Sequence, residues 1–124
     1  MEIGHMLKKL HRIKKKRDFD KFFGPSFRKN KGYSAKSDHV IVKSLKNDLD
    51  ISRFAFVIST KVDKRATKRN LVKRRLREIV RLRLKKIRGG YDIVFIAQKG
   101  IVERPYKELE KQVELLMNKL RLFE

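Results

Sequence analysis

The sequence predicts one α+β domain over residues 1–124, a sandwich of about four strands covered by helices in the order α-β-β-β-α-β-α. Its 124 residues are enough for one hydrophobic core. Hydrophobic residues make up 40% of the chain, so that core can be packed. Short apolar runs typical of strands are interrupted by two long helical patterns, and no repeat or linker marks a second domain.

The N-terminal region is strongly basic. Leu7 to Arg17 holds eight basic residues counting His11, and we expect residues 1–17 to form a flexible basic arm. Asp18 or Asp20 can cap a short helix that ends at Gly24-Pro25. Phe19 and Phe23 are four residues apart and share a face of this helix, a spacing that by itself favours a core role.

Three apolar runs predict strands. Asp38 to Leu45 contains one short strand, and Gly32 to Ser34 indicates irregular or edge structure before it. Ser52 to Thr60 is apolar on both faces, which predicts a central, covered strand. Tyr91 to Ala97 is apolar enough for a buried strand.

Two helices follow the strands. The first begins near Thr67 and runs to Arg88, before Gly89-Gly90. It joins two strands, so a crossover between parallel strands is expected. The second opens at Pro105 and runs to about Leu122. Its packing stripe consists of Leu109, Val113, Leu116 and Leu120.

The charge of the chain indicates a polyanionic partner. The formal net charge is +21, from 35 basic and 14 acidic residues. Lys64 to Arg88 has 13 basic residues among 25 and one acid, Glu78. At 100° per residue, Val72, Leu76 and Ile79 fall on one flank of the helix. The opposite arc is cationic and contains Arg69, Asn70, Lys73, Arg74, Arg77 and Arg81. Like charges four residues apart repel each other, so a merely solvated face is a poor explanation.

Catalytic chemistry in the protein itself is not indicated. His5, His11 and His39 have no diagnostic spacing, and the acids are scattered. The chain has no Cys, which suits a cytoplasmic protein. No apolar run is long enough for a membrane span, so no membrane partner is expected.

The string from Arg69 to Glu78, RNLVKRRLRE, resembles the RNxxKRxxRE signature of the bacterial ribonuclease P protein subunit. Arg17-Asp18-Phe19 with Phe22-Phe23 resembles the N-terminal aromatic helix of that family. Ile58 to Lys61 resembles its strand ending in V-S-K-K. The resemblance extends from about Leu7 to Ala97.

The resemblance implies a protein that binds two RNAs. The ribonuclease P RNA subunit would be the catalyst, using Mg²⁺ to remove the 5′ leader of precursor tRNA, and the protein alone would be inactive. No further protein partner would be required. Phe19, Phe23 and Lys61 would line the leader cleft, with Phe22 in the core. The residues facing RNA on the signature helix would be Lys68, Arg69, Asn70, Lys73, Arg74, Arg77 and Arg81. The crossover would be left-handed, as is known in this family.

Some positions depart from the family pattern. Ala55 stands where a small residue, often Gly, is usual, and Thr60 where Lys is common. Val42 or His39 stands where an aromatic residue is often found on the preceding strand.

Two alternatives to this function are open. One is a ribosomal or RNA-chaperone protein that binds structured RNA without a leader or a ribozyme partner. The other is a DNA-binding module with the basic helix in a major groove. A row of phosphate-seeking cations with few groups suited to base edges argues against sequence-specific reading.

Overall fold

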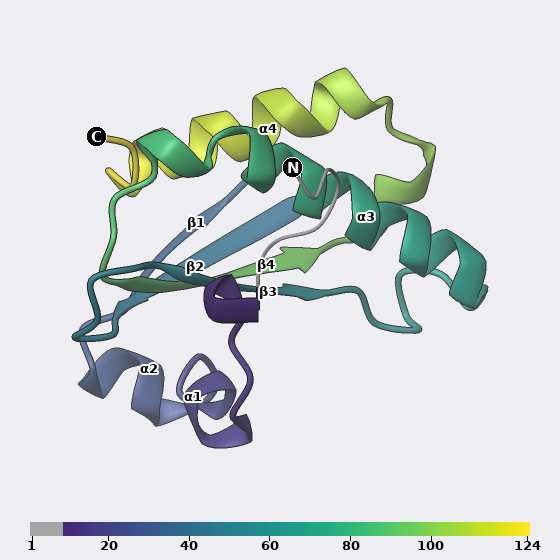
Figure 1. Cartoon of the computed structure of the whole chain (residues 1–124). Helices are drawn as coiled ribbons and strands as arrows, with labels where there is room; N and C mark the ends of the chain where they lie inside the picture. Colours follow the sequence, from purple (N-terminus) through teal and green to yellow (C-terminus); the bar gives the residue numbers. More distant parts are fainter. Residues whose placement is uncertain (1–8) are drawn as a thin grey trace.

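The computed structural model describes residues 9–124 of the chain (Figure 1). The helices are α1 (Lys16–Asp20), α2 (Pro25–Lys29), α3 (Ala66–Leu82) and α4 (Tyr106–Lys119). The strands are β1 (Tyr33–Lys36), β2 (Val40–Lys46), β3 (Arg53–Val57) and β4 (Tyr91–Ala97). Three single turns of 3-10 helix complete it: η1 (Lys9–His11), η2 (Leu84–Lys86) and η3 (Ile101–Glu103).

The four strands form one sheet in the order β1-β2-β4-β3. β2 is antiparallel to both β1 and β4, and β3 is parallel to β4. In Figure 1, β3 and β4 run in the same direction, α3 crosses above the sheet, and β4 lies behind β3. The crossover is therefore left-handed, as the resemblance implied.

The predicted central position of the strand at Ser52 to Thr60 is wrong. The strand is shorter, Arg53–Val57, and β3 lies at an edge of the sheet. Apolar residues occur on both of its faces because α3 covers one face and the N-terminal segment supplies contacts on the other side. The backbone N–H of Ile13 donates to the Phe54 carbonyl at 3.0 Å, and Arg12 bridges to Phe54 in parallel. The edge is thus partly covered.

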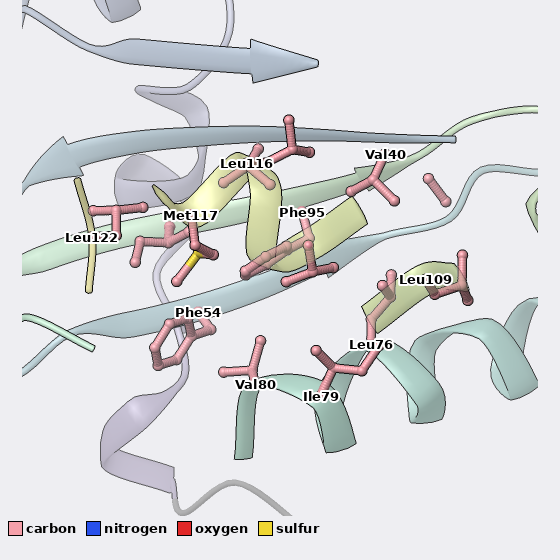
Figure 2. Packing of buried hydrophobic residues seen from close by; sticks show 14 of the residues in the cluster. Val40, Phe54, Leu76, Ile79, Val80, Phe95, Leu109, Leu116, Met117 and Leu122 are labelled. Atoms are coloured by element: carbon pink, nitrogen blue, oxygen red, sulfur yellow. The ribbon is translucent and has the colours of Figure 1, made fainter. Parts of the chain in front are cut away.

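The main core lies between the sheet and the two long helices (Figure 2). α3 contributes Val72, Leu76, Ile79 and Val80, so the predicted packing flank is confirmed. α4 contributes Leu109, Val113, Leu116 and Met117, while Leu120 is only partly buried. Each such side chain contributes about 1.5–3 kcal/mol when fully buried, which holds the helices on this face.

The first long helix ends earlier than predicted, at Leu82 rather than Arg88. Arg83 leaves the helical conformation, a turn of 3-10 helix follows over Leu84–Lys86, and the guanidinium of Arg83 donates to Glu110 and Glu114 of α4 at 2.7 Å each. Ile87 is then buried and bridges to Phe123 near the C-terminus. The expected role of Gly89 as a helix stop is also wrong. A Cβ there would collide with the carbonyl oxygen of Asp50, so this position needs glycine for close packing.

The N-terminal region is more ordered than predicted. α1 begins at Lys16 without a side-chain cap, so neither Asp18 nor Asp20 caps it. A second short helix, α2, starts at Pro25. Both lie on the sheet face opposite α3 and α4 (Figure 1). Within the predicted flexible arm, His11, Arg12 and Ile13 contact β3 and the residue before it, and residues 1–8 lie outside the described part of the chain.

Candidate nucleic-acid interface

The cationic side of α3 faces away from the core, as the residue pattern predicts. Asn70 and Arg74 are exposed, and Lys68, Arg69, Lys73, Arg77 and Arg81 are partly buried. The buried stripe on the opposite flank fixes this orientation of the helix. The structure therefore brings all seven predicted RNA-facing residues onto one helix, though they are not equally available.

Two of the seven side chains are already engaged within the protein. The guanidinium of Arg69 donates to the carbonyl oxygens of Asp63 and Lys64, at 3.0 and 2.9 Å. Arg69 therefore holds the loop before α3 as well as contributing charge. Arg81 binds both carboxylate oxygens of Glu78, at 2.9 and 2.7 Å. Its charge is largely compensated, which makes it the weakest candidate in the row.

The loop before α3 is held by a second arginine. Arg65 donates to Asp63 from its backbone N–H at 2.8 Å and from its guanidinium at 3.0 and 2.8 Å. These hydrogen bonds lower the pKa of Asp63 to about 2. Asp63 thus pairs with a neighbouring cation and fixes the loop that leads into the cationic helix.

A groove runs between α3 and the N-terminal segment, and three cations border it. Arg12, Lys73 and Arg77 surround a floor made by Phe54, Ala55 and Phe56. Burial lowers the pKa of Arg77, and the nearby charges of Arg12 and Arg74 lower it further. Repulsion among fixed cations is relieved by a bound anion, so this groove is suited to a phosphate.

Arg12 is a residue that the sequence did not single out. It lies within the run read as a flexible arm, and only the apolar breaks Leu10 and Ile13 hinted at a packed segment. His11 strengthens the attachment, because its Nδ1 lies 3.0 Å from the carbonyl oxygen of Ser52. The basic N-terminal segment thus extends the cationic surface of α3 across the edge of β3.

The aromatic residues of the N-terminal region separate into a core member and a surface pair. Phe22 is fully buried against Leu45 and Val94, as expected. Phe19 and Phe23 lie in contact, with ring centroids 5.2 Å apart. The ring of Phe23 is 40% exposed, whereas Phe19 is partly buried against the same cluster as Phe22. Phe23 is consequently the more available stacking surface.

Lys43 lies beside this pair and was also missed. Its ammonium sits 5.1 Å from the ring centroid of Phe23 and 5.0 Å from that of Phe27. It also donates to the carbonyl oxygen of Phe22 at 3.1 Å. On β2 the alternation of side chains places Lys43 on the side of α1 and α2.

Val42 and His39, one of which stands where the family often has an aromatic residue, lie away from the Phe19–Phe23 pair. Val42 is fully buried in the core on the opposite sheet face. His39 is held by Gln112, whose amide nitrogen lies 3.0 Å from its Nδ1. On the α1 side of the sheet, Ala55, Val57 and Ile96 are partly buried and pack against the Phe22 cluster.

Lys61 is exposed in the loop after β3. The contacts among the described residues do not join it to Phe19 or Phe23. Its place in the cleft therefore stays a prediction.

A buried ion pair positions α1 against the sheet. Arg53 donates to both carboxylate oxygens of Asp92, and its Nη2 lies 3.4 Å from Asp18 of α1. The hydrogen bond to Asp92 raises the pKa of Arg53 despite the opposing effect of burial. This network fixes the helix that carries Phe19.

Within residues 9–124, no three His, Cys, Asp or Glu side chains gather in a way that could hold a metal ion. None of the described helices is both long and apolar enough to cross a membrane.

The fold and this surface together define a basic α+β protein with the features of a nucleic-acid-binding protein. The chain belongs to the ribonuclease P protein family, because the sequence model of that family, described as Ribonuclease P, matches residues 7–121. It is 35% identical over 116 residues to the ribonuclease P protein component of Alkaliphilus oremlandii, covering 94% of this chain and 96% of that one. It is likewise 35% identical over 108 residues to the component from Clostridioides difficile, covering 86% and 89%.

Solved structures agree with this assignment. A Staphylococcus aureus RNase P protein mutant superposes with a TM-score of 0.80 at 26% identity, covering 93% of this chain and 92% of that chain. The RNase P protein from Thermotoga maritima gives a TM-score of 0.72 at 30% identity, covering 86% and 96%. Membership in this family implies a role in ribonuclease P and an RNA partner in the holoenzyme.

Proposed function

We propose that this protein binds the catalytic RNA subunit of ribonuclease P and the 5′ leader of precursor tRNA. It thereby promotes the Mg²⁺-dependent endonucleolytic removal of the leader. The observation that carries the proposal is the groove bordered by Arg12, Lys73 and Arg77, together with the Phe19–Phe23 pair on the α1 side of the sheet. Cations at its border suit a phosphate backbone, and exposed rings suit unpaired bases.

The surface of α3 is the proposed contact with the RNA subunit. Exposed Asn70 and Arg74, with partly buried Lys68, Lys73 and Arg77, form its centre. Arginine can bind a phosphate through two N–H groups, which lysine cannot reproduce. Arg69 contributes through its remaining N–H groups, and Arg81 contributes least because Glu78 occupies its guanidinium.

The leader is proposed to lie over the floor formed by Ala55, Val57 and Ile96. The exposed ring of Phe23 would stack on a base, and Phe19 would support that ring from behind. Lys43 can meet a leader phosphate from the same side. Lys61 would act at the far end of the cleft. None of these contacts depends on base identity, so a leader of any sequence is accommodated.

Bond cleavage is assigned to the RNA subunit in this proposal. The donor set of residues 9–124 offers no metal-binding group of three side chains, so we place the Mg²⁺ ions on the RNA. The protein residues bind and orient the two RNAs. No other protein partner is required. Because precursor tRNA is the proposed substrate, we place the reaction in the bacterial cytoplasm.

Reconstitution tests the proposal directly. The protein is combined with a bacterial ribonuclease P RNA, and cleavage of precursor tRNA is followed as Mg²⁺ is titrated. The protein should lower the Mg²⁺ requirement and favour substrates with a leader over mature tRNA. The protein without RNA should leave precursor tRNA intact. Cleavage by the protein alone, or an unchanged Mg²⁺ requirement, would contradict the proposal.

A further inference from the structure

A second cationic groove lies at the end of the sheet where α2 and α4 terminate. It has a volume of about 680 Å³ and is open to solvent along the start of β1 and the end of β2. Figure 1 shows the end of α2 and the C-terminal end of α4 at this same end of the sheet. This second groove shares no lining residue with the groove beside α3, and neither Phe19 nor Phe23 lines it.

Five cations line this groove, and no acid does. They are Lys31, Lys46, Arg88, Lys119 and Arg121. Within residues 9–124, no ion pair involves any of the five. Asp48 and Glu124 line the adjoining pocket, which shares Lys46 and Arg88 with the groove. Uncompensated cations gathered in a concave site favour an anionic ligand.

The backbone holds several of these cations in fixed places. Lys31 and Arg121 follow the ends of α2 and α4 with φ values of 58° and 56°, a conformation that non-glycine residues seldom adopt. The carbonyl oxygen of Arg121 accepts a hydrogen bond from the Nε of Arg88 at 3.0 Å. The backbone that carries Lys31, Arg88 and Arg121 at the edge of the groove is therefore well defined.

Two tyrosines also line the groove. The side chain of Tyr33 is 67% exposed and belongs to neither hydrophobic cluster, so the core does not explain it. Tyr91 is partly buried at the edge of the main core. Neither hydroxyl forms a hydrogen bond with another described residue. An exposed ring beside cations is a stacking surface for a base whose phosphates those cations bind.

We propose that this groove binds a second segment of single-stranded RNA, with a base stacked on Tyr33 and phosphates at Lys46 and Lys119. The exposed ring of Tyr33 favours RNA over an acidic peptide, because a base stacks on an aromatic ring and a carboxylate does not. The site does not depend on the RNA subunit or on the α3 surface. It can hold RNA outside the leader cleft, so that one protein contacts two separate stretches.

The test uses the full chain carrying Lys73→Ala and Arg77→Ala, which weakens binding at α3. Tyrosine rings are isotopically labelled, and NMR follows them as a uridine octamer is added; the chain has three tyrosines and no tryptophan, so the spectrum is simple. The ring signals of Tyr33 should shift as they do under a stacked base. Binding is measured in parallel by fluorescence anisotropy of a labelled octamer.

Variants separate charge from stacking. Tyr33→Leu should weaken octamer binding by about 5-fold to 140-fold, the range typical of one lost base stack. The pair Lys46→Ala and Lys119→Ala should reduce the slope of log affinity against log salt by about 1.4, or 0.7 for each phosphate contact. The matched control, Lys107→Ala with Lys111→Ala, removes two exposed cations of α4 that lie outside the groove and should leave the slope unchanged.

Three outcomes overturn the proposal. The first is an unshifted Tyr33 ring at saturating octamer. The second is equal weakening by the groove pair and by the control pair. The third is competition by polyglutamate as strong as that by the octamer, which would identify the groove as a site for acidic protein. Each of these outcomes would leave the proposed role of α3 intact, because that role is tested separately by binding to the RNA subunit.

Discussion

Arg53 of β3 and Asp92 of β4 form a two-point ion pair across parallel strands, with Nε–Oδ1 and Nη2–Oδ2 distances of 2.8 and 2.6 Å. The side chain of Asp92 is 8% exposed and that of Arg53 is 19% exposed. Asn47 donates to the same carboxylate at 2.9 Å, which completes its hydrogen bonding. The pair therefore joins β3 to β4 and reaches α1 through Asp18.

Replacing Arg53 with Met should destabilise the fold strongly. The carboxylate of Asp92 would stay buried with Asn47 as its remaining side-chain partner, and an uncompensated buried charge costs about 3–5 kcal/mol. Urea unfolding followed by circular dichroism measures the change. The control is Lys16→Met, which removes an exposed ion pair with Asp20 and should cost less than about 1 kcal/mol. A similar small loss for both variants would show that the Arg53–Asp92 pair is no stronger than a surface pair.

Asp63 provides a prediction about pH. Its hydrogen bonds from Arg65 lower its pKa from 3.8 to about 2, so the folded state favours the ionised carboxylate. The ionised carboxylate of Asp63 therefore stabilises the fold at pH values above its unfolded-state pKa of 3.8. This stabilisation is lost as the pH falls from about 4 toward 2. Replacing Arg65 with Gln should return the pKa of Asp63 toward its ordinary value. NMR titration of the carboxyl carbon measures it, and an unchanged titration in the variant would remove Arg65 as the cause.

The sequence predicted the parts of the fold that depend on local pattern. The stripe of Val72, Leu76 and Ile79 correctly gave the buried side of α3, because helical periodicity is a property of the segment itself. The end of that helix was placed too late, because residues 83–88 continue its basic and apolar pattern, whereas the structure has a 3-10 turn at Leu84–Lys86 and a bridge from Ile87 to the distant Phe123. The spacing of apolar residues predicts which side of a helix is buried, but it does not predict which other segment of the chain packs there.

The same limit explains the edge strand and the missed site residues. Apolar residues on both faces of β3 suggested a central strand, because the sequence gave no sign that the N-terminal segment would cover its edge. Arg12 was hidden in a run of similar charges. Lys43 could be assigned to the cleft only once the register of β2 against β4 was known, because a shift of one residue reverses the face.

The pair Lys73 and Arg77 should carry much of the affinity for RNA. We assume that each of the two side chains contacts one phosphate of an RNA duplex, and each such contact contributes about 0.9 to the slope of log affinity against log salt. Replacing both residues with Ala should therefore reduce this slope by about 1.8. Binding to the RNA subunit is measured by filter retention across a salt series. Lys107 and Lys111 offer a matched control, because they are also four residues apart on a helix and are exposed. Equal effects of the two double variants would show a general charge effect and no specific surface.

Phe22 and Phe23 are neighbours in the chain with opposite environments, and this contrast tests the leader cleft. Phe22 is fully buried, so Phe22→Ala should cost about 3–5 kcal/mol of folding stability. Phe23 is 40% exposed, so Phe23→Ala should leave the fold stable. It should instead reduce the preference for precursor tRNA over mature tRNA by about 1–3 kcal/mol, the value of one lost stack.

Substrate affinity of the reconstituted holoenzyme, measured with and without a leader, gives the preference for each variant. Phe19→Ala should combine both effects, since Phe19 touches the ring of Phe23 and also packs against the Phe22 cluster. Binding of the RNA subunit should persist in Phe23→Ala, because α3 is untouched. If Phe23→Ala kept the full leader preference while losing stability, the ring would belong to the core, as its helical spacing with Phe19 alone suggests.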